Sequence, residues 1–247
     1  MYAGFSVLAV IPARGGSKGL PNKNILNCAG KPLIEWTIAA AQGARAIDDV
    51  LVSTDSVEIA MVSQRVGATV PFLRPAALAG DDSSSLDVIR HAWEWHPDAN
   101  GRPFDYIVVL QPTSPLRTSA HISKAIVVYF KNRRSDDDTL VSVYQVGRKH
   151  GWLMQAAGDS GYVRFCLDVG SGNPQRQIMK QYYLPNGSIF VVRGTCCGEG
   201  LYRDNTLPFV MDAADSVDID TSDDMREAES ILRQRTGQTE VLDNAGL

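Results

Sequence analysis

The stretch from Arg14 to Asn24 combines glycines with positively charged side chains, directly after the apolar run Val7–Pro12. Its sequence is Arg-Gly-Gly-Ser-Lys-Gly-Leu-Pro-Asn-Lys-Asn. Glycines let backbone N–H groups approach a phosphate closely, and arginine and lysine neutralise its charge. The stretch lacks the Gly-Lys-Ser/Thr ending of a Walker A loop and the G-x-G-x-x-G spacing of a dinucleotide fingerprint. It therefore predicts an anion site of another kind, with a surface turn carrying scattered charges as the simpler alternative.

A pair of acids, Asp218 and Asp220, supplies the opposite charge near the other end of the chain. In an extended segment alternate side chains share a face, so both carboxylates project together. They repel each other unless a cation lies between them, and Mg²⁺ takes oxygen ligands while keeping waters and substrate phosphates in its shell. The pair therefore predicts a magnesium site, or else a solvated strand end. Asp223 and Asp224 follow Thr221, a predicted helix N-cap, and are better explained as first-turn acids that the helix dipole favours.

Apolar segments alternate with amphipathic ones along most of the chain. The segments expected to form strands are Val7–Ile11, Asp49–Thr54, Ala68–Phe72, Tyr106–Leu110, Leu140–Val146, Ser188–Val192 and Phe209–Met211. Helices with one apolar face are expected after Pro32, after Asp55, over Ser84–Trp95, after Ser119 and over Ser222–Arg235. Strands that alternate with helices form βαβ units. The expected fold class is therefore α/β, a three-layer, mainly parallel, twisted sheet with helices on both faces.

The alternation fails between about residues 147 and 183, where basic, aromatic and glycine-rich pieces mix without a period. Loops of that length are uncommon inside a compact domain. We therefore expect residues 1–247 to form one domain, with 147–183 as an inserted arm used for dimerisation or as a lid.

The composition argues against several classes of protein. A net charge of −4 is unlike that of a general nucleic-acid binder, which needs a broad basic surface. No apolar run is long enough to span a membrane, and the first residues lack the basic segment of a signal peptide. The four cysteines form no C-x-x-C pair and the four histidines have no metal-ligand spacing, so a zinc site is not expected. A cytoplasmic protein with thiols in its core is the favoured interpretation.

Four motifs occur in the order found in a known family. They are Ile11–Asn24, Gly30–Ile34, Leu110–Arg117 (Leu-Gln-Pro-Thr-Ser-Pro-Leu-Arg) and Asp218–Thr221 (Asp-Ile-Asp-Thr). Together they resemble the acylneuraminate (CMP-sialic acid) synthetases over roughly residues 6–235. The resemblance implies the fold of the nucleotide-diphospho-sugar transferases, a homodimer, Mg²⁺ as the cofactor and a role in making cell-surface polysaccharides.

Members of this family use CTP and a nine-carbon 2-keto sugar acid, release pyrophosphate and make a CMP-sugar acid. The resemblance implies that the chain transfers CMP to the anomeric hydroxyl of N-acetylneuraminate or a related nonulosonate such as legionaminate. The related Kdo enzymes usually have proline after Leu-Pro-x-Lys, whereas Asn24 follows Lys23 here, which favours nine-carbon acids. Pseudaminate or Kdo as the acceptor, and a non-catalytic nucleotide-sugar-binding module, are the alternatives.

The resemblance also assigns roles on the nucleotide side. The matching positions are Arg14, Ser17, Lys18, Lys23, Asn24, Arg74, Ser83 and Gln111. Arg14, Ser17, Lys18 and Lys23 would hold the triphosphate, and Asn24 would reach the ribose. Arg74 and Ser83 would read the cytosine edge, and Gln111 would contact both ribose and sugar. Attack on the α-phosphate needs charge neutralisation more than covalent help. The expected catalytic residues are therefore Arg14, Lys23 and Asp220, the last of which would assist deprotonation.

On the sugar side the matching positions are Gln111, Arg176, Gln177, Asn186 and Phe190. Arg176 would pair with the sugar carboxylate, because a planar guanidinium can bind a carboxylate through two hydrogen bonds. Phe190 also falls where a core aromatic would fall. Over residues 175–181 the family's usual Arg-Arg-Gln-Asp-Leu-Pro-Lys is replaced by Gln-Arg-Gln-Ile-Met-Lys-Gln. The pocket wall therefore differs from the family pattern, and the identity of the sugar acid stays open.

Overall fold

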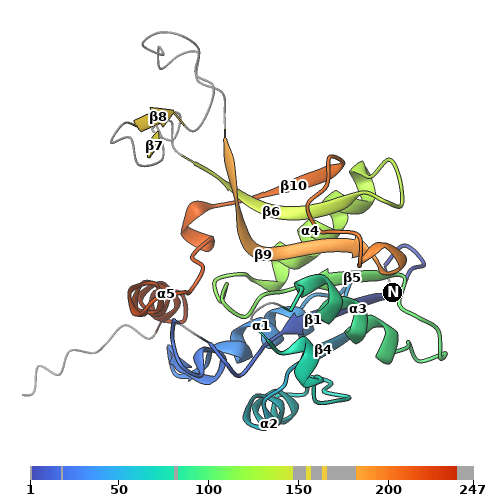
Figure 1. Cartoon of the computed structure of the whole chain (residues 1–247), viewed down its shortest axis with the longest axis horizontal. Helices are drawn as coiled ribbons and strands as arrows, with labels where there is room; N and C mark the ends of the chain where they lie inside the picture. Colours follow the sequence, from blue (N-terminus) through green and yellow to red (C-terminus); the bar gives the residue numbers. More distant parts are fainter. Residues whose placement is uncertain are drawn as a thin grey trace, which may run out of the picture.

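A computed structural model describes residues 2–17, 19–80, 83–146 and 182–237, together with two short strands at 154–156 and 163–165. The main sheet has six strands in the order β10-β6-β9-β5-β1-β4 (Figure 1). These strands are β1 (Val7–Pro12), β4 (Asp49–Ser53), β5 (Tyr106–Val109), β6 (Thr139–Gln145), β9 (Tyr183–Arg193) and β10 (Thr206–Met211). The α-helices are α1 (Leu33–Gln42), α2 (Val57–Arg65), α3 (Ser85–Trp95), α4 (Ser119–Asn132) and α5 (Ser222–Arg235).

β1 lies at the centre of the largest parallel part of the sheet. It pairs in parallel with β4 on one side and with β5 on the other, and β6 pairs in parallel with β10. β9 is antiparallel to both β5 and β6, because the chain returns along β6 with Tyr183 opposite Gln145. The expectation of a mainly parallel sheet is confirmed, but the sequence did not predict the direction of β9.

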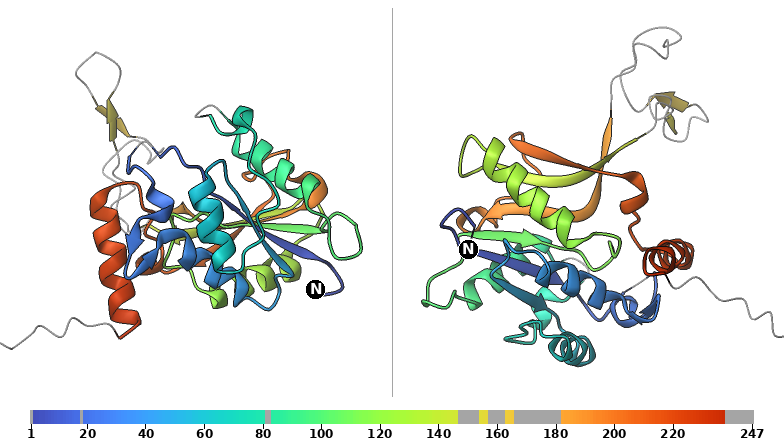
Figure 2. Two further views of the ribbon diagram at one scale, coloured as in Figure 1. Left: turned by 90° about the horizontal axis from the view of Figure 1, so that it is seen from below. Right: turned by 180° about the vertical axis from the view of Figure 1, so that it is seen from behind.

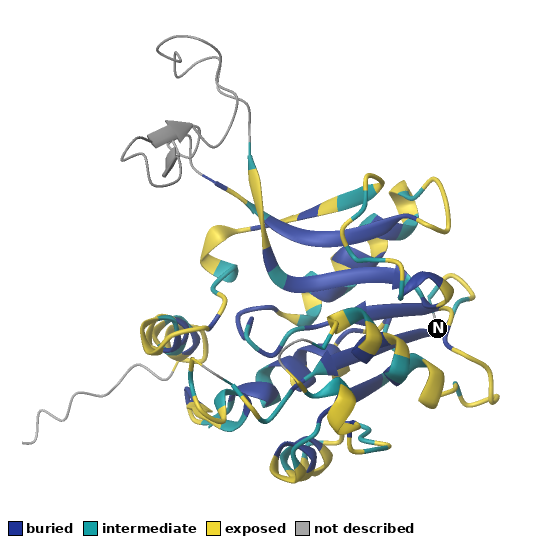
Figure 3. Cartoon of the chain, in the orientation of Figure 1, coloured by how far each residue is buried: buried dark blue, intermediate teal, exposed yellow. Residues whose placement is uncertain are grey.

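Helices cover both faces of the sheet (Figure 2). Val7, Ala9 and Ile11 pack in one core with α1, α2 and α4, whereas Leu8 and Val10 pack in a second core with α3. This alternation follows from the two-residue period of a strand, and the inner strands are accordingly buried along their length (Figure 3). A third, smaller cluster packs α5 beside β2 (Asn27–Cys28), which pairs with β3 (Lys31–Pro32). The three-layer arrangement is therefore confirmed.

The expected strand at Ala68–Phe72 is wrong. The segment makes only isolated parallel bridges, at Thr69 with Leu51 and at Leu73 with Thr54. Pro71 has no backbone N–H to donate, so a continuous ladder cannot form there. The segment nevertheless runs beside β4 and delivers the residues after it to the same edge of the sheet.

Most of the predicted arm at 147–183 lies outside the described residues. Within it, β7 (Met154–Ala156) and β8 (Val163–Phe165) pair as an antiparallel two-stranded sheet. Its use as a dimerisation arm or lid stays a prediction. In the described part of the chain no helix combines the length and the apolar character needed to cross a bilayer.

The carboxyl ends of the three parallel strands β1, β4 and β5 meet at one edge of the sheet. The glycine-rich stretch follows β1, Asp55 follows β4, and Gln111 follows β5. The acidic segment around Asp218 reaches this edge from β10, because the backbone N–H of Ile219 donates to the carbonyl of Thr113 at 2.9 Å. Ligands of open α/β sheets bind outside the carboxyl ends of the strands, so this edge is where a site is expected.

Candidate active site

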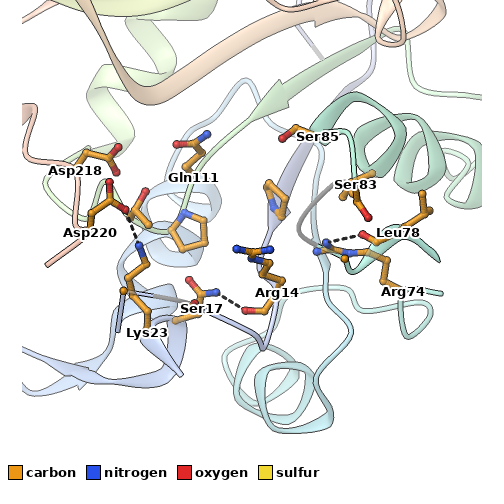
Figure 4. Close-up of a pocket in the computed structure, with 17 residues that line it drawn as sticks. Arg14, Ser17, Lys23, Arg74, Leu78, Ser83, Ser85, Gln111, Asp218 and Asp220 are labelled. Carbon is orange, nitrogen blue, oxygen red and sulfur yellow. Dashed lines mark hydrogen bonds and ion pairs between the residues drawn. The ribbon is translucent and has the colours of Figure 1, made fainter. Parts of the chain in front are cut away.

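A cleft of about 490 Å³ opens at this edge of the sheet. Figure 4 shows Asp218 and Asp220 at one end, Arg14 in the middle, and Arg74 with Ser83 at the other. The cations and the acids predicted from separate parts of the sequence thus line one cavity. The cleft contains both halves of the expected nucleotide site.

The stretch after β1, which we call the phosphate loop (residues 13–24), is held at the strand edge by the Asp55 side chain. The helix expected after Asp55 begins at Val57, and its N-cap is Ser56, since Ser56 Oγ accepts the N–H of Ile59. The Asp55 carboxylate accepts the N–H of Gly15 instead, at 2.9 Å. Asp55 therefore anchors the phosphate loop, a role that its position before a helix did not suggest.

The predicted nucleotide-binding residues in the described part of the loop line the cleft. Arg14, Ser17, Lys23 and Asn24 all contribute to its wall. Asn24 is 6% exposed, and its side-chain amide donates to the carbonyl of Arg14 at 3.0 Å. This bond shapes the loop from inside, while contact with a ribose stays a prediction. Lys18 lies outside the described residues.

The phosphate loop touches the acidic segment directly. Lys23 Nζ donates to the carbonyl of Ile219 at 2.5 Å and pairs with Asp220 Oδ1 at 3.0 Å. A Cβ added at Gly19 would come within 2.6 Å of the Asp220 carbonyl oxygen. Real Cβ atoms essentially never approach backbone so closely, so Gly19 is required for this contact. Two segments about two hundred residues apart in the chain are therefore in direct contact, through a close backbone approach at Gly19 and through the bonds of Lys23.

The two acids alternate as expected. Ile219 between them is fully buried, whereas Asp218 and Asp220 both line the cleft. Protein around Asp218 removes part of its hydration, and this desolvation raises its pKa; a hydrogen bond from Thr113 opposes the shift and the charge of Asp220 adds to it. The two carboxylates repel each other, and a cation bound between them would remove this repulsion.

Mg²⁺ fits this donor set. The two carboxylates are hard oxygen ligands facing a cleft that also carries the cations predicted to bind phosphate. Over the residues that the structure describes, no cluster of three or more His, Cys, Asp or Glu side chains could hold a metal. The protein would thus supply two ligands, with waters and substrate phosphates as the others. Asp224 accepts the N–H groups of Asp220 and Thr221 at the start of α5, so it belongs to the helix cap, as expected.

At the far end of the cleft, Arg74 is held firmly by backbone. It is 7% exposed, and its guanidinium donates to the carbonyls of Ser53 and Leu78. Desolvation lowers its pKa, with a small opposing influence from Asp55. Ser83 lines the cleft beside it and donates to the Ala77 carbonyl at 3.2 Å. This rigid end suits the recognition of a flat base, although the cytosine contacts themselves stay predictions.

The predicted sugar residues divide into two groups. Gln111 lines the cleft, but Asn186 and Phe190 are not among its lining residues. Asn186 is 3% exposed. Its side-chain oxygen accepts hydrogen bonds from Ser142 Oγ and the N–H of Ser188, and its side-chain nitrogen donates to Ser216 Oγ. Phe190 is 2% exposed and packs in the core. Both side chains are therefore buried in this structure, and their contact with a sugar stays a prediction. Arg176 and Gln177 lie outside the described residues.

A family model for cytidylyltransferases matches residues 8–150, which is more than half of the chain. The chain belongs to the cytidylyltransferase family. It is 33% identical over 238 residues to a CMP-N,N'-diacetyllegionaminic acid synthase of Legionella pneumophila, covering 92% of this chain and 96% of that protein. It is also 33% identical over 234 residues to an N-acylneuraminate cytidylyltransferase of Escherichia coli, covering 94% of this chain and 53% of that protein. The chain thus spans about half the length of several relatives it matches, including that one. The resemblance drawn from the four motifs is confirmed.

The fold of this cytidylyltransferase also matches solved structures. A CMP:2-keto-3-deoxy-manno-octonic acid synthetase in complex with CTP aligns with a TM-score of 0.70 at 17% identity, over 93% of this chain and 99% of the other. A 4-diphosphocytidyl-2C-methyl-D-erythritol synthase of Anaerococcus prevotii aligns with a TM-score of 0.64 at 12% identity, over the same shares. At these identities the likeness concerns the fold alone.

Two residues near Asp218 were missed from the sequence, and one of them lines the cleft. Thr113 lines the cleft, hydrogen-bonds Asp218 and accepts the N–H of Ile219. Its place two residues after Gln111 in a matched motif was the available signal. Tyr202 stacks edge-on against Phe190 at 5.7 Å, and desolvation together with the Asp218 charge raises its pKa. No sequence signal pointed to it, because the residues around it carry no motif.

Proposed function

We propose that this cytidylyltransferase transfers CMP from CTP to the anomeric hydroxyl of a nine-carbon 2-keto sugar acid and releases pyrophosphate. The observation that carries the proposal is the direct contact of the phosphate loop with the acidic segment, through Lys23 and Asp220 at 3.0 Å. One cleft thus has cationic side chains that would bind a triphosphate and acidic side chains that would hold a metal ion near the acceptor hydroxyl. The names of the relatives, which include legionaminic acid and acylneuraminate enzymes, support the same acceptor class.

In the proposed reaction the acceptor hydroxyl oxygen forms a bond to the α-phosphorus. The bond from that phosphorus to the bridging oxygen of the β-phosphate breaks, and pyrophosphate leaves with its electron pair. Arg14 and Lys23 neutralise the charge on the phosphates. Asp220 takes the hydroxyl proton, and Asp218 and Asp220 would hold Mg²⁺. Bound there, Mg²⁺ would supply charge neutralisation and a lower pKa for a bound hydroxyl.

The Lys23–Asp220 pair must open for this role. Lys23 is 12% exposed at its side chain and Asp220 is 78% exposed, so Asp220 keeps most of its contact with solvent. A triphosphate at Lys23 would take the place of this carboxylate and release Asp220 toward the acceptor.

The test is pyrophosphate release from CTP in the presence of Mg²⁺ and a panel of acids. The panel contains N-acetylneuraminate, legionaminate, pseudaminate and Kdo, with UTP replacing CTP as the control. We expect release with at least one nine-carbon acid and with CTP only. Release with none of the acids would overturn the enzymatic assignment and leave a nucleotide-sugar-binding module, and release with Kdo alone would overturn the nine-carbon assignment.

The proposal includes a cytoplasmic homodimer built through the 147–183 arm. Sedimentation at the assay concentration should give a species of twice the chain mass of 26.9 kDa. A purely monomeric species would contradict the proposed dimer without bearing on the chemistry.

A further inference from the structure

Arg117 is a buried arginine without an acidic partner in the described part of the chain. It is 2% exposed, and its guanidinium is bound by neutral oxygens. One terminal nitrogen donates to the carbonyls of Gln111 at 3.2 Å and Ser188 at 2.7 Å, and the other donates to Thr37 Oγ1 at 2.6 Å. Burial lowers the pKa of Arg117 to about 9. A charge in such a place is costly unless it is hydrogen-bonded, and here three bonds to neutral oxygens offset that cost.

The three oxygens belong to three different elements. Gln111 follows β5, Ser188 lies in β9, and Thr37 lies in α1. β5 and β9 are antiparallel neighbours, and their ladder runs only from Tyr106 opposite Arg193 to Val109 opposite Phe190. Beyond that point the two strands share no ladder bond. Arg117 therefore joins the segment after β5 to β9 beyond the point where the ladder ends.

One of the two joined segments, the one after β5, reaches the cleft. Gln111 lines the cleft next to Asp218 (Figure 4). A Cβ at Gly187 would come within 2.5 Å of Gln111 Oε1 and 3.6 Å of Asp218 Oδ2. Gly187 has a φ of +68° and is followed directly by Ser188, the residue that Arg117 holds. Any shift of the two held carbonyls therefore moves the Gln111 amide relative to Asp218.

We propose that Arg117 is a positioning residue for the acceptor step, holding the carbonyls of Gln111 and Ser188 so that the Gln111 amide stays against Gly187 beside Asp218. The inference rests on the proposed function. The phosphate loop is held by other bonds, from Asp55 and Lys23, so it does not depend on Arg117. CTP therefore keeps its triphosphate contacts when the guanidinium is lost, whereas the sugar acid loses the placement of Gln111.

The kinetic test compares Arg117→Lys with Arg133→Lys. Lysine keeps the charge but cannot reproduce the planar fork. Arg133 is a matched control, since its side chain is 19% exposed and contacts Tyr106 at the opposite end of β5. For Arg117→Lys we expect kcat/KM for the sugar acid to fall about tenfold or more, with the Kd for CTP within about threefold, as a misplaced site residue predicts. An unchanged kcat/KM, or the same split in Arg133→Lys, would overturn the inference.

If Arg117→Lys does not fold, a second pair of variants tests the same role. Thr37→Val removes one bond to the guanidinium, whereas Thr37→Ser keeps the hydroxyl. Thr37→Val should lower kcat/KM for the sugar acid by a smaller factor than Arg117→Lys, again with little change in the Kd for CTP. Thr37→Ser should have the parent values. Equal kinetics for both variants would contradict the role.

Crystal structures of the parent and Arg117→Lys give a readout that needs no turnover. The Gln111 amide should leave Gly187 in the variant, and an unmoved amide would refute the positioning role. This result also separates the two proposals. If the parent released no pyrophosphate with any acid, the proposed function would fail, and the structures would still decide whether Arg117 positions Gln111.

Discussion

Replacing Gly19 by alanine should separate the phosphate loop from the acidic segment. The new Cβ would lie 2.6 Å from the Asp220 carbonyl oxygen, whereas ordinary van der Waals contact begins at 3.4 Å. Both sides of this contact are backbone, so the loop must retreat by about 0.8 Å. Lys23 and Asp220 lie on the two segments that part. A displacement of about 1 Å costs on the order of 10²-fold in rate, and we expect that loss in kcat/KM for Gly19→Ala.

Gly16→Ala is the matched control for this variant. Gly16 lies in the same loop, but a Cβ there would meet nothing within 4 Å. Pyrophosphate release with CTP and the accepted sugar acid would be measured for both variants, together with Tm. Gly16→Ala should keep kcat/KM within about threefold and both proteins should melt within a few degrees of the parent, because both glycines lie at the surface. A Gly19→Ala enzyme as active as Gly16→Ala would refute the requirement for this contact.

Further predictions concern the two acids. Asp220→Asn should lower kcat about 10²-fold or more while calorimetry still detects CTP binding, because the carboxylate acts on the metal and the transition state; a near-normal kcat would contradict this role. Asp218→Asn should raise Tm at pH 7 without Mg²⁺. The folded pKa of Asp218 is raised above its value of 3.8 in the unfolded chain, so its ionised form is disfavoured by folding and the penalty grows as the pH rises through this range. The gain should vanish near pH 3, where the group is protonated in both states, and a pH-independent Tm difference would argue against it. Added Mg²⁺ should raise Tm of the parent but not of Asp218→Asn, which a thermal shift assay would decide.

Elements that depend on local pattern were predictable from the sequence. β1, β4 and β5 lie where continuous apolar runs placed them, and Thr221 with Asp224 forms the expected cap of α5. These features depend on side-chain period and on hydrogen bonds within a few residues, and both can be read along the chain. One error came from overlooking a single residue: Pro71 lacks the backbone N–H that the expected strand at Ala68–Phe72 needed.

The chemical character of the site was also evident from residue types. Charge and spacing in the sequence single out Arg14, Lys23, Asp218 and Asp220, and the cleft brings these four residues together. For Phe190 and Asn186 the sequence identified the positions but not their burial. The packing of β9 buries both side chains, and their contact with a sugar stays a prediction.

The sequence by itself determined the fold class, the family and the two charged halves of the site, because each depends on residue types and short spacings. Only the tertiary structure decided that Gly19 touches Asp220, that Asp55 anchors the phosphate loop and that Arg117 bridges β5 and β9. Such contacts depend on the order and direction of strands that lie far apart in the chain. No local pattern encodes them, since they form only when the sheet has brought their residues to one edge.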